Sequence, residues 1–364
     1  MYRLIRPLLF RLDAEQAHGL TLAGLRAAGR FGLSRWLLRS LFELDDPRLE
    51  VEAFGLRFKN PVGLAAGYDK NGLAISGLSA IGFGHLEIGT LTRLPQAGNP
   101  RPRIHRLAAA QALVNSMGFP NAGIEALPSR LRGAPGAQPA NRLPTRIGVN
   151  LGKGRDTPLD EAVGDYCALL SAVHARGQAD YVAINVSSPN TRGLRQLQAR
   201  QALESLLSTL VKLRDGLQPR LPLLVKVAPD LSEAEADDVL TAVFSAGGDG
   251  LIVTNTTVSR EGVPQAGDLP GGVSGAPLRA RSTALIRHLA RQTAGRLPII
   301  GVGGILSPAD ALEKLRAGAA LVQIYTGLVY TGPGLVRAIN HELLRACERD
   351  GLAGASALTA SGQL

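Results

Sequence analysis

Eight short apolar runs, each followed by a helical pattern, constrain the fold of this chain more than any other feature. The runs occupy residues 61–65, 85–89, 146–151, 181–186, 223–227, 250–254, 297–302 and 320–325. The amphipathic patterns that follow them lie at about 71–80, 121–133, 159–176, 200–216, 232–246, 278–293, 308–317 and 334–348. Eight consecutive strand–helix units with apolar strands predict an α/β fold, the closed parallel (β/α)8 or TIM barrel. A doubly wound open sheet is the competing architecture, but it rarely carries so many consecutive units.

The two ends of the chain fall outside this repeat. Residues 1–45 form a small N-terminal extension of basic, amphipathic helical segments that include Trp36, the only tryptophan. Such helices are typical of a membrane interface; the alternative is that they cap the bottom of the barrel. Residues 46–350 supply the barrel, and the small and polar residues 351–364 predict a flexible tail.

Charge and composition limit the classes of function. The formal net charge of +10 indicates an anionic partner, which can be a nucleic acid, an anionic membrane face or a phosphorylated cofactor. RNA-binding proteins usually combine a basic patch with stacking aromatics, whereas here the arginines are scattered and aromatics make up 4%. Cys167 and Cys347 lack metal-ligand spacing, so we expect no metal site and a reducing compartment. With no apolar run of the ~20 residues that a spanning helix needs, we expect a cytoplasmic location.

Uncharged polar residues gather where the fourth strand ends. The apolar run 181–186 is followed by Pro189, which cannot continue a sheet ladder, so the chain must turn there. The turn presents Asn185, Ser188 and Asn190 together at the end of the strand. In a barrel, the carboxyl ends of the strands form the catalytic face. Amides and hydroxyls donate and accept hydrogen bonds without charge, which suits a small, flat, polar ligand. The alternative is an ordinary turn that closes the strand.

Two long connections are expected over the same face. Residues 91–120 and 258–276 are too long for ordinary βα loops, which indicates a functional role. The first contains the segment 115–119, and the second contains a glycine-rich run at 271–275.

Further strand ends predict a phosphate site and a substrate site. Glycine-containing segments 300–305 and 323–327 end the seventh and eighth strands, where barrels bind phosphate. Lys226 lies within the fifth strand, and an inward lysine there must meet an anion or lose its charge; the alternative is that it snorkels from the strand end. The ammonium group of Lys70 suits a carboxylate. The expected substrate cluster is Lys70, Asn115, Asn185, Asn190, Asn255 and Thr256.

These residues closely resemble the quinone-dependent, membrane-associated class of dihydroorotate dehydrogenase. The match covers nearly the whole chain and includes residues 59–67, 185–191, 226–230, 254–257 and the two phosphate loops. The resemblance implies oxidation of dihydroorotate to orotate through FMN in de novo pyrimidine biosynthesis, with a membrane quinone as final electron acceptor. It implies a peripheral protein on the cytoplasmic side of the cell (inner) membrane. We expect a monomer with no nucleic-acid partner.

The resemblance also implies residue roles. Ser188 is implied as the base that removes the C5 proton of the substrate while a hydride leaves C6 for flavin N5. FMN contacts are implied for Ala66, Gly67, Tyr68, Asp69, Lys70, Thr90, Asn150, Asn185, Lys226, Thr254, Gly275, Gly304, Tyr325 and Thr326. Substrate contacts are implied for Lys70, Asn115, Ser116, Met117, Gly118, Phe119, Asn185, Asn190, Asn255 and Thr256. His18 and Arg106 align with quinone-side positions, and Tyr68 departs from the aliphatic residue more frequent in the family.

Two other hypotheses remain. A tRNA-modifying flavin reductase would explain the positive charge, but that class generally uses a cysteine acid, and both cysteines lie away from strand ends. A non-catalytic membrane-binding protein with an inactive barrel is the second. Reduction of bound FMN by dihydroorotate distinguishes both from the dehydrogenase.

Overall fold

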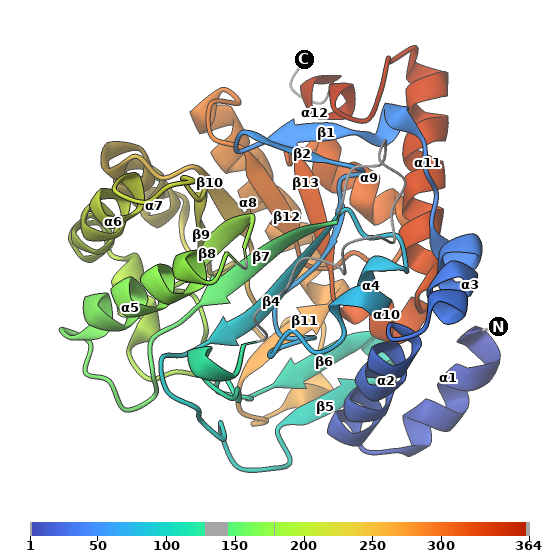
Figure 1. Cartoon of the computed structure of the whole chain (residues 1–364), viewed down its shortest axis with the longest axis horizontal. Helices are drawn as coiled ribbons and strands as arrows, with labels where there is room; N and C mark the ends of the chain where they lie inside the picture. Colours follow the sequence, from blue (N-terminus) through green and yellow to red (C-terminus); the bar gives the residue numbers. More distant parts are fainter. Residues whose placement is uncertain (1, 128–144, 178, 362–364) are drawn as a thin grey trace.

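A closed eight-stranded parallel barrel forms the centre of the molecule. The computed structural model describes residues 2–127, 145–177 and 179–361 (Figure 1). All eight predicted runs form barrel strands, and the order around the barrel follows the chain, which confirms the TIM barrel. The strands are β3 (Val62–Leu64), β4 (His85–Leu91), β7 (Arg146–Leu151), β8 (Tyr181–Asn185), β9 (Leu223–Val227), β10 (Gly250–Val253), β12 (Ile299–Val302) and β13 (Leu321–Ile324).

Helices surround the barrel as the amphipathic patterns predict, with one exception. The helices are α4 (Ile75–Ser79), α5 (Ala162–Ala175), α6 (Arg200–Asp215), α7 (Glu233–Ala246), α8 (Arg279–Thr293), α9 (Pro308–Arg316), α10 (Thr326–Thr331) and α11 (Gly334–Asp350). The helix expected at 121–133 is wrong where the structure describes it, because only a short 3₁₀ turn, Ile124–Ala126, forms there. The rest of that range lies outside the described residues. The six-residue α10 was not predicted.

A two-stranded hairpin closes the N-terminal end of the barrel. It consists of β1 (Val51–Ala53) and β2 (Leu56–Phe58). The fully buried ring of Phe58 packs edge-on against His85 at 5.5 Å between ring centroids, and His85 packs against Tyr181 at 6.5 Å. Burial lowers the pKa of His85 to about 3, so this ring is neutral. Side chains therefore fill this end, and a ligand site is left to the opposite end.

The two long connections meet over the other end of the barrel. The first supplies β5 (Ile104–Leu107) and β6 (Ala112–Asn115), and the second supplies β11 (Gly272–Gly275). They pair as an antiparallel sheet in the order β11-β6-β5, with Asn115 opposite Gly272. This sheet covers the mouth of the barrel (Figure 1), as expected for both connections.

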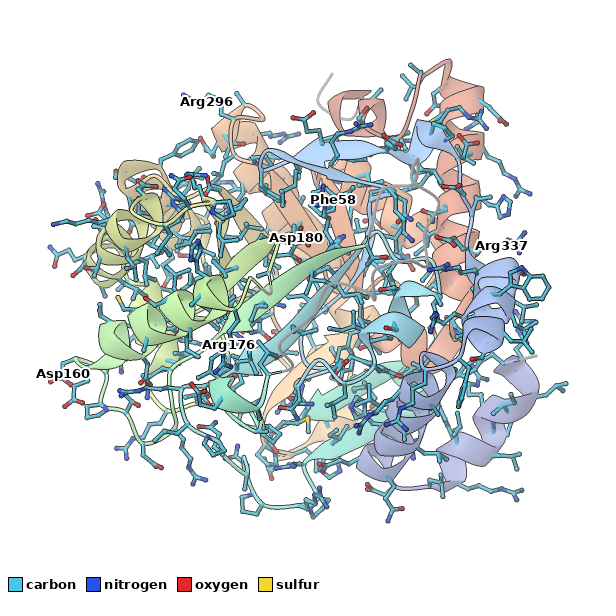
Figure 2. All side chains as sticks on the ribbon, viewed as in Figure 1. Phe58, Asp160, Arg176, Asp180, Arg296 and Arg337 are labelled. Atoms are coloured by element: carbon cyan, nitrogen blue, oxygen red, sulfur yellow. The ribbon has the colours of Figure 1, made fainter. Side chains whose placement is uncertain are left out.

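The N-terminal extension packs along one side of the barrel. Its helices are α1 (Tyr2–Arg11), α2 (Ala14–Ala28) and α3 (Gly32–Phe42), which contact α10, α4 and α11 respectively. Arg337 reaches from α11 toward α3 (Figure 2) and donates to the carbonyl of Leu41 at 3.0 Å. The alternative that these helices cap the bottom of the barrel is wrong, because the β1–β2 hairpin occupies that end. Within the described residues, no helix combines the length and apolarity needed to cross a membrane.

The C-terminal segment differs from the expected flexible tail as far as residue 361. Residues Ala357–Ser361 form α12, and Leu358 is fully buried. The backbone N–H of Ala355 donates to the carbonyl of Arg48 at 2.7 Å, and the Thr359 hydroxyl donates to the carbonyl of Ala319 at 2.9 Å. The composition is small and polar, but the buried Ala355 and Leu358 and these hydrogen bonds fix the segment against the barrel. Residues 362–364 lie outside the described part.

Candidate active site

One cavity, here called the mouth cavity, lies between the carboxyl ends of the barrel strands and the covering sheet. The structure brings most of the predicted site residues to its wall. These are Ala66, Gly67, Lys70, Thr90, Asn115, Met117, Gly118, Phe119, Asn185, Ser188, Asn190, Lys226, Thr254, Asn255, Thr256, Gly275, Gly304, Tyr325 and Thr326. Tyr68, Asp69, Ser116 and Asn150 do not line it.

A buried ion pair sits in the barrel beside this cavity. The carboxylate of Glu87 accepts hydrogen bonds from Lys226 Nζ at 3.1 Å, from Asn150 Nδ2 at 2.7 Å and from Gln323 Nε2 at 2.8 Å. Lys226 therefore meets an anion inside the barrel, as predicted for an inward lysine, and the snorkelling alternative is wrong. Glu87 was not predicted as a site residue, and Gln323 was predicted only as part of the phosphate segment 323–327 and not as a partner of Glu87. The sequence does single out Glu87, because it is the one carboxylate within the strand run 85–89, and a buried carboxylate there needs a partner.

An amide and hydroxyl network connects three neighbouring strand ends. Asn185 Nδ2 donates to Thr90 Oγ1 at 3.0 Å and to Asn150 Oδ1 at 3.1 Å, and Thr90 Oγ1 donates to Asn150 at 2.5 Å. On its other side, Asn185 Oδ1 accepts from Ser187 Oγ at 3.1 Å and from Asn255 Nδ2 at 3.3 Å. Because both ends of the Asn185 amide are used, its orientation is fixed before any ligand binds.

Ser188 follows β8 and is almost completely buried in the cavity wall. Its Oγ accepts a hydrogen bond from the backbone N–H of Asn190 at 3.2 Å, so the ordinary-turn interpretation holds alongside the cavity position. The Asn190 amide in turn donates to the backbone carbonyl of Asn115 at 3.1 Å and to its side-chain oxygen at 3.2 Å. The loop after β8 is thereby joined to the end of β6 in the covering sheet.

Arg195 bonds the loop after β8 on the side away from the mouth cavity. This arginine was not predicted as a site residue. Its guanidinium donates to the carbonyl of Ser187 at 3.0 Å, to the Asp230 carboxylate at 2.9 Å and to the carbonyl of Thr256 at 3.0 Å. These three partners belong to the connections after β8, β9 and β10. A fixed fork of donors suits this arrangement, because each acceptor lies on a different loop.

Lys70 and Asp69 follow the first barrel strand but differ in role. Lys70 Nζ donates to the carbonyl of Gly67 at 2.6 Å, and burial lowers the pKa of Lys70 to about 8. The Asp69 carboxylate instead accepts from the backbone N–H groups of Leu73 and Ala74, at 2.9 and 2.7 Å, just before α4. Asp69 therefore fixes the loop that carries Lys70, and its pKa is raised by burial.

The predicted phosphate end of the cavity requires glycine at two positions. Gly304 has a φ of +74°, and a side chain there would place Cβ 2.4 Å from Arg279 Cα. Gly275 has a φ of +100°, and a Cβ there would lie 2.3 Å from the carbonyl oxygen of Gln111. Glycine at both positions lets the backbone of the cavity wall pack tightly against α8 and Gln111, and neither residue puts a side chain into the cavity.

A second cavity of about 390 Å³, here called the helix cavity, lies between the N-terminal helices and the barrel. Its lining is largely apolar, and it shares Ile104, Leu113 and Tyr325 with the mouth cavity. The two spaces are therefore neighbours on either side of these three side chains. The exposed ends of the N-terminal helices and the catalytic face of the barrel are linked by an apolar space.

The predicted quinone-side residues both line the helix cavity. His18 packs edge-on against Tyr68 at 4.8 Å, and burial, helped by the Lys70 charge, lowers the pKa of His18 to about 4. The Tyr68 hydroxyl lies 3.1 Å from Thr21 Oγ1. Tyr68 thus belongs to this cavity and not to the mouth cavity where we expected it.

Arg106 lines the helix cavity, but its guanidinium is engaged with α1. It donates to the carbonyl of Leu9 at 3.1 Å, to that of Phe10 at 3.3 Å and also to that of Leu12. It also stacks over the Phe10 ring at 4.8 Å. A cation at a helix C-terminus stabilises the unpaired carbonyls there. Arg106 therefore fastens α1 to the covering sheet.

Comparison with known proteins identifies the family. The family model described as dihydroorotate dehydrogenase matches residues 48–346. The chain is 49% identical over 359 residues to dihydroorotate dehydrogenase (quinone) of Acidithiobacillus ferrooxidans, with 96% of each chain covered. It is 50% identical over 363 residues to the protein of that name from Thermosynechococcus vestitus, covering 95% of this chain and 97% of that one. DHODH from Eimeria tenella in complex with ferulenol has a TM-score of 0.84 at 35% identity, covering 96% of this chain and 97% of that one. The chain belongs to the dihydroorotate dehydrogenase family, and within it to the quinone-dependent enzymes of pyrimidine biosynthesis.

Proposed function

We propose that the mouth cavity holds FMN, that dihydroorotate reacts there at Ser188, and that the electrons reach a membrane quinone through the helix cavity. Family membership supplies the reaction, and the proposal assigns it to these residues. The observation that carries the proposal is the shared wall of the two cavities at Ile104, Leu113 and Tyr325. A space lined by amides, hydroxyls and two lysines, which suit the substrate, adjoins at that wall a largely apolar space that suits a quinone.

The residues of the mouth cavity fit a flavin nucleotide. Lys226, fixed by Glu87, offers a cation to the electron-rich edge of a reduced ring system. Gly275 and Gly304 line the cavity without a side chain, so a phosphate can approach their backbone. A bound flavin supplies hydride acceptance and subsequent electron transfer. The chain's own contribution is to hold it at a fixed place between the substrate residues and the helix cavity.

The remaining polar groups fit a small pyrimidine acid. Lys70 offers a point charge to its carboxylate, and Asn115, Asn190 and Asn255 offer amides to its ring. The Thr256 hydroxyl is buried and has no hydrogen-bond partner among the described residues. A buried hydroxyl left unpaired costs free energy, so a substrate atom that pairs with it would be stabilised there.

Ser188 is the proposed base. A serine hydroxyl is a weak base at its ordinary pKa, so neighbouring groups must favour its deprotonated form. The backbone N–H of Asn190 donates to Ser188 Oγ at 3.2 Å, and such a hydrogen bond favours negative charge on the oxygen. Burial of Ser188 excludes bulk water from the proton transfer.

The helix cavity is proposed to admit the quinone. A neutral His18 ring and the Tyr68 hydroxyl can bond the carbonyl oxygens of an uncharged headgroup without a charge to desolvate. Arg106 acts on this side by holding α1 in place. At the outer surface, Leu4 and Leu8 of α1 are 80% and 61% exposed, and Leu33 and Trp36 of α3 are 77% and 63% exposed.

Those exposed apolar side chains support peripheral attachment to a membrane. Exposed Leu and Trp beside arginines are typical of helices that lie in a lipid interface. The proposal places a monomer at the cytoplasmic face of the membrane, with no nucleic-acid partner. Access of a lipid-soluble quinone from the bilayer to the helix cavity follows from that placement.

The test is a stopped-flow absorbance record of the purified protein. We expect a yellow protein whose flavin absorbance bleaches on anaerobic mixing with dihydroorotate and returns on mixing with quinone. A protein that stays colourless after incubation with FMN contradicts the cofactor assignment. Bleaching by a nicotinamide cofactor but not by dihydroorotate contradicts the substrate assignment.

A further inference from the structure

Lys314 is a buried lysine that the proposed chemistry does not use. It lies on α9, and its side chain is completely buried. Nζ donates to Ser282 Oγ at 3.1 Å, to Thr283 Oγ1 at 3.0 Å and to the carbonyl of Arg279 at 3.4 Å. All three acceptors lie within the first five residues of α8, and none carries a negative charge.

Lys314 has no direct ion-pair partner, although the charges of Glu313 and Asp310 act on it from a longer distance. Among the described residues, no carboxylate oxygen lies within ion-pair distance of its Nζ. The acidic groups nearest in sequence, Asp310 and Glu313, both face Arg279, at 2.7 and 3.6 Å. A buried ammonium without a counter-ion is costly, so an anion bound close by would stabilise it. Burial lowers the pKa of Lys314 to about 7 against the charges of Glu313 and Asp310, and a phosphate bound close by would raise it again and keep the ammonium protonated.

The first turn of α8 lies directly behind the glycines of the phosphate end. A Cβ at Gly304 would lie 2.4 Å from Arg279 Cα, and a Cβ at Gly303 would lie 3.2 Å from Ser282 Cβ. Ser282 also donates to the carbonyl of Val302, the last residue of β12, at 2.5 Å. Lys314 is thus joined to the backbone of the cavity wall by two hydrogen bonds through Ser282.

The wall itself offers no cation at this end. The cavity residues there are Ser274, Gly275, Gly303, Gly304, Tyr325 and Thr326, and all are uncharged. Lys70 and Lys226 are the cations of the cavity lining, and they follow or lie in other strands. Lys314 is the buried cation without a direct ion-pair partner that is bonded to the start of α8, which packs against these glycines.

We infer that Lys314 is a positioning residue for the cofactor phosphate, and that its charge makes the site prefer FMN over riboflavin, the same flavin without the phosphate. The inference rests on the proposed function, since it presupposes flavin in the mouth cavity. Lys314 acts through the first turn of α8 and through the field of its ammonium, and it does not touch the phosphate. Backbone N–H groups supply the direct contacts, and the lysine behind them supplies the charge.

A competition experiment with the holoenzyme tests this. The protein is dialysed against equal excess concentrations of FMN and riboflavin, and the bound flavins are released and quantified by chromatography. Lys314→Met removes the charge and keeps the length of the side chain. We expect it to lower the bound FMN-to-riboflavin ratio by about tenfold, the effect of a buried charge acting at moderate distance. Lys314→Gln keeps hydrogen bonding without charge, and it gives a second measurement if the methionine variant does not fold.

Lys153→Met is the matched control. Lys153 is also buried and donates only to carbonyls, those of Gly154 and Thr157. A general loss of packing would weaken both flavins alike and leave the ratio unchanged, as we expect for this control. A wild-type ratio in both Lys314 variants overturns the inference and leaves the proposed function intact. A wild-type protein that retains neither flavin overturns the proposed function itself.

Discussion

Ser188 is the side chain on which the proposed proton transfer depends. Ser188→Ala should keep bound FMN, because the substitution removes one oxygen and leaves the buried backbone in place. We expect flavin reduction by dihydroorotate to slow by ~10²-fold or more, the usual contribution of a general base. Anaerobic stopped-flow absorbance measures this step directly.

The neighbouring Ser187→Ala is the control for Ser188→Ala. Ser187 bonds Asn185 and Asn255, so its loss should disturb the site less, by under about tenfold. Near-normal reduction in Ser188→Ala would exclude this serine as the base. Equal losses in both variants would point to a general disturbance of the loop.

Lys70 should impose a pH dependence on substrate binding. Burial lowers the pKa of Lys70 from the usual 10.5 to about 8. Its side chain is therefore positively charged below pH 8 and loses this charge as the pH rises above 8. The carboxylate of dihydroorotate loses its partner when the lysine becomes neutral. At pH values above 8, KM for dihydroorotate should therefore increase, by up to about tenfold for each further pH unit.

The measurement is KM between pH 6 and 10, compared with Lys70→Arg. The arginine stays charged throughout this range, so the rise in KM should be absent in that variant. A KM that stays flat to pH 10 in the wild-type protein contradicts the assigned role of Lys70.

At the scale of elements, three connections are held together by one arginine. Arg195 joins the loops after β8, β9 and β10. Arg195→Gln should loosen the loop that carries Ser188, and we expect kcat to fall by about tenfold or more, because small misplacements of a reacting group are costly. The FMN content should change little, since Arg195 does not line the mouth cavity.

Arg200→Gln is the control for Arg195→Gln. Arg200 lies at the start of α6, and its ion pairs with Glu204 and Asp238 are at the surface. Such pairs contribute little, so activity should be unchanged. If kcat in Arg195→Gln equals that of this control, the three-loop clasp has no part in catalysis.

Elements with a strong local pattern were predictable, and those formed by distant pairing were not. The eight barrel strands follow from apolar runs that can only be buried. The covering sheet joins residues 104–115 to 272–275, and no local pattern reveals a pairing across that separation. The α10 helix has six residues, too few to show a helical period. The helix expected at 121–133 had the period but formed only a 3₁₀ turn in its described part.

Single residues of the site were likewise predictable from local sequence only where their position along a strand decides their place in the fold. Most cavity residues could be found because they follow strand ends, which converge in any barrel. Asp69 also follows a strand end, but its carboxylate accepts hydrogen bonds from backbone N–H groups instead of facing the cavity. The spacing of residues along the chain does not predict this orientation. Arg195 lies seven residues beyond Ser188 in an unremarkable segment, and its three partners come together only in the fold.

At the scale of the whole molecule, the N-terminal helix α1 is bonded to α10, a helix that begins at the mouth cavity. Tyr2 and Arg6 of α1 donate to the carbonyls of Val329 and Tyr330, at 2.5 and 3.0 Å, near the end of α10. The other end of α10 begins at Thr326 in the mouth cavity. Family membership also decides against the tRNA-modifying reductase and the inactive barrel.

Membrane attachment through α3 can be tested without truncating the chain. Leu33→Asp combined with Trp36→Asp replaces two exposed apolar side chains that touch no buried core. Because each such side chain contributes about 1.5–3 kcal/mol when transferred from water, vesicle binding should weaken by about a hundredfold or more. Turnover with a long-chain quinone in vesicles should fall in parallel. Reduction of the flavin by dihydroorotate, and turnover with a soluble short-chain quinone, should stay unchanged.

Phe244→Asp supplies the comparison for this double variant. Phe244 is an exposed apolar residue on α7, on the far side of the barrel from α1–α3 (Figure 1). A charge there should leave vesicle binding intact, because that side faces away from the proposed membrane contact. If the α3 variant retains long-chain quinone turnover in vesicles, the quinone does not enter from a bilayer held by this helix. If both quinones lose turnover equally, the substitutions damage the helix cavity itself, and the attachment role of α3 fails as the explanation.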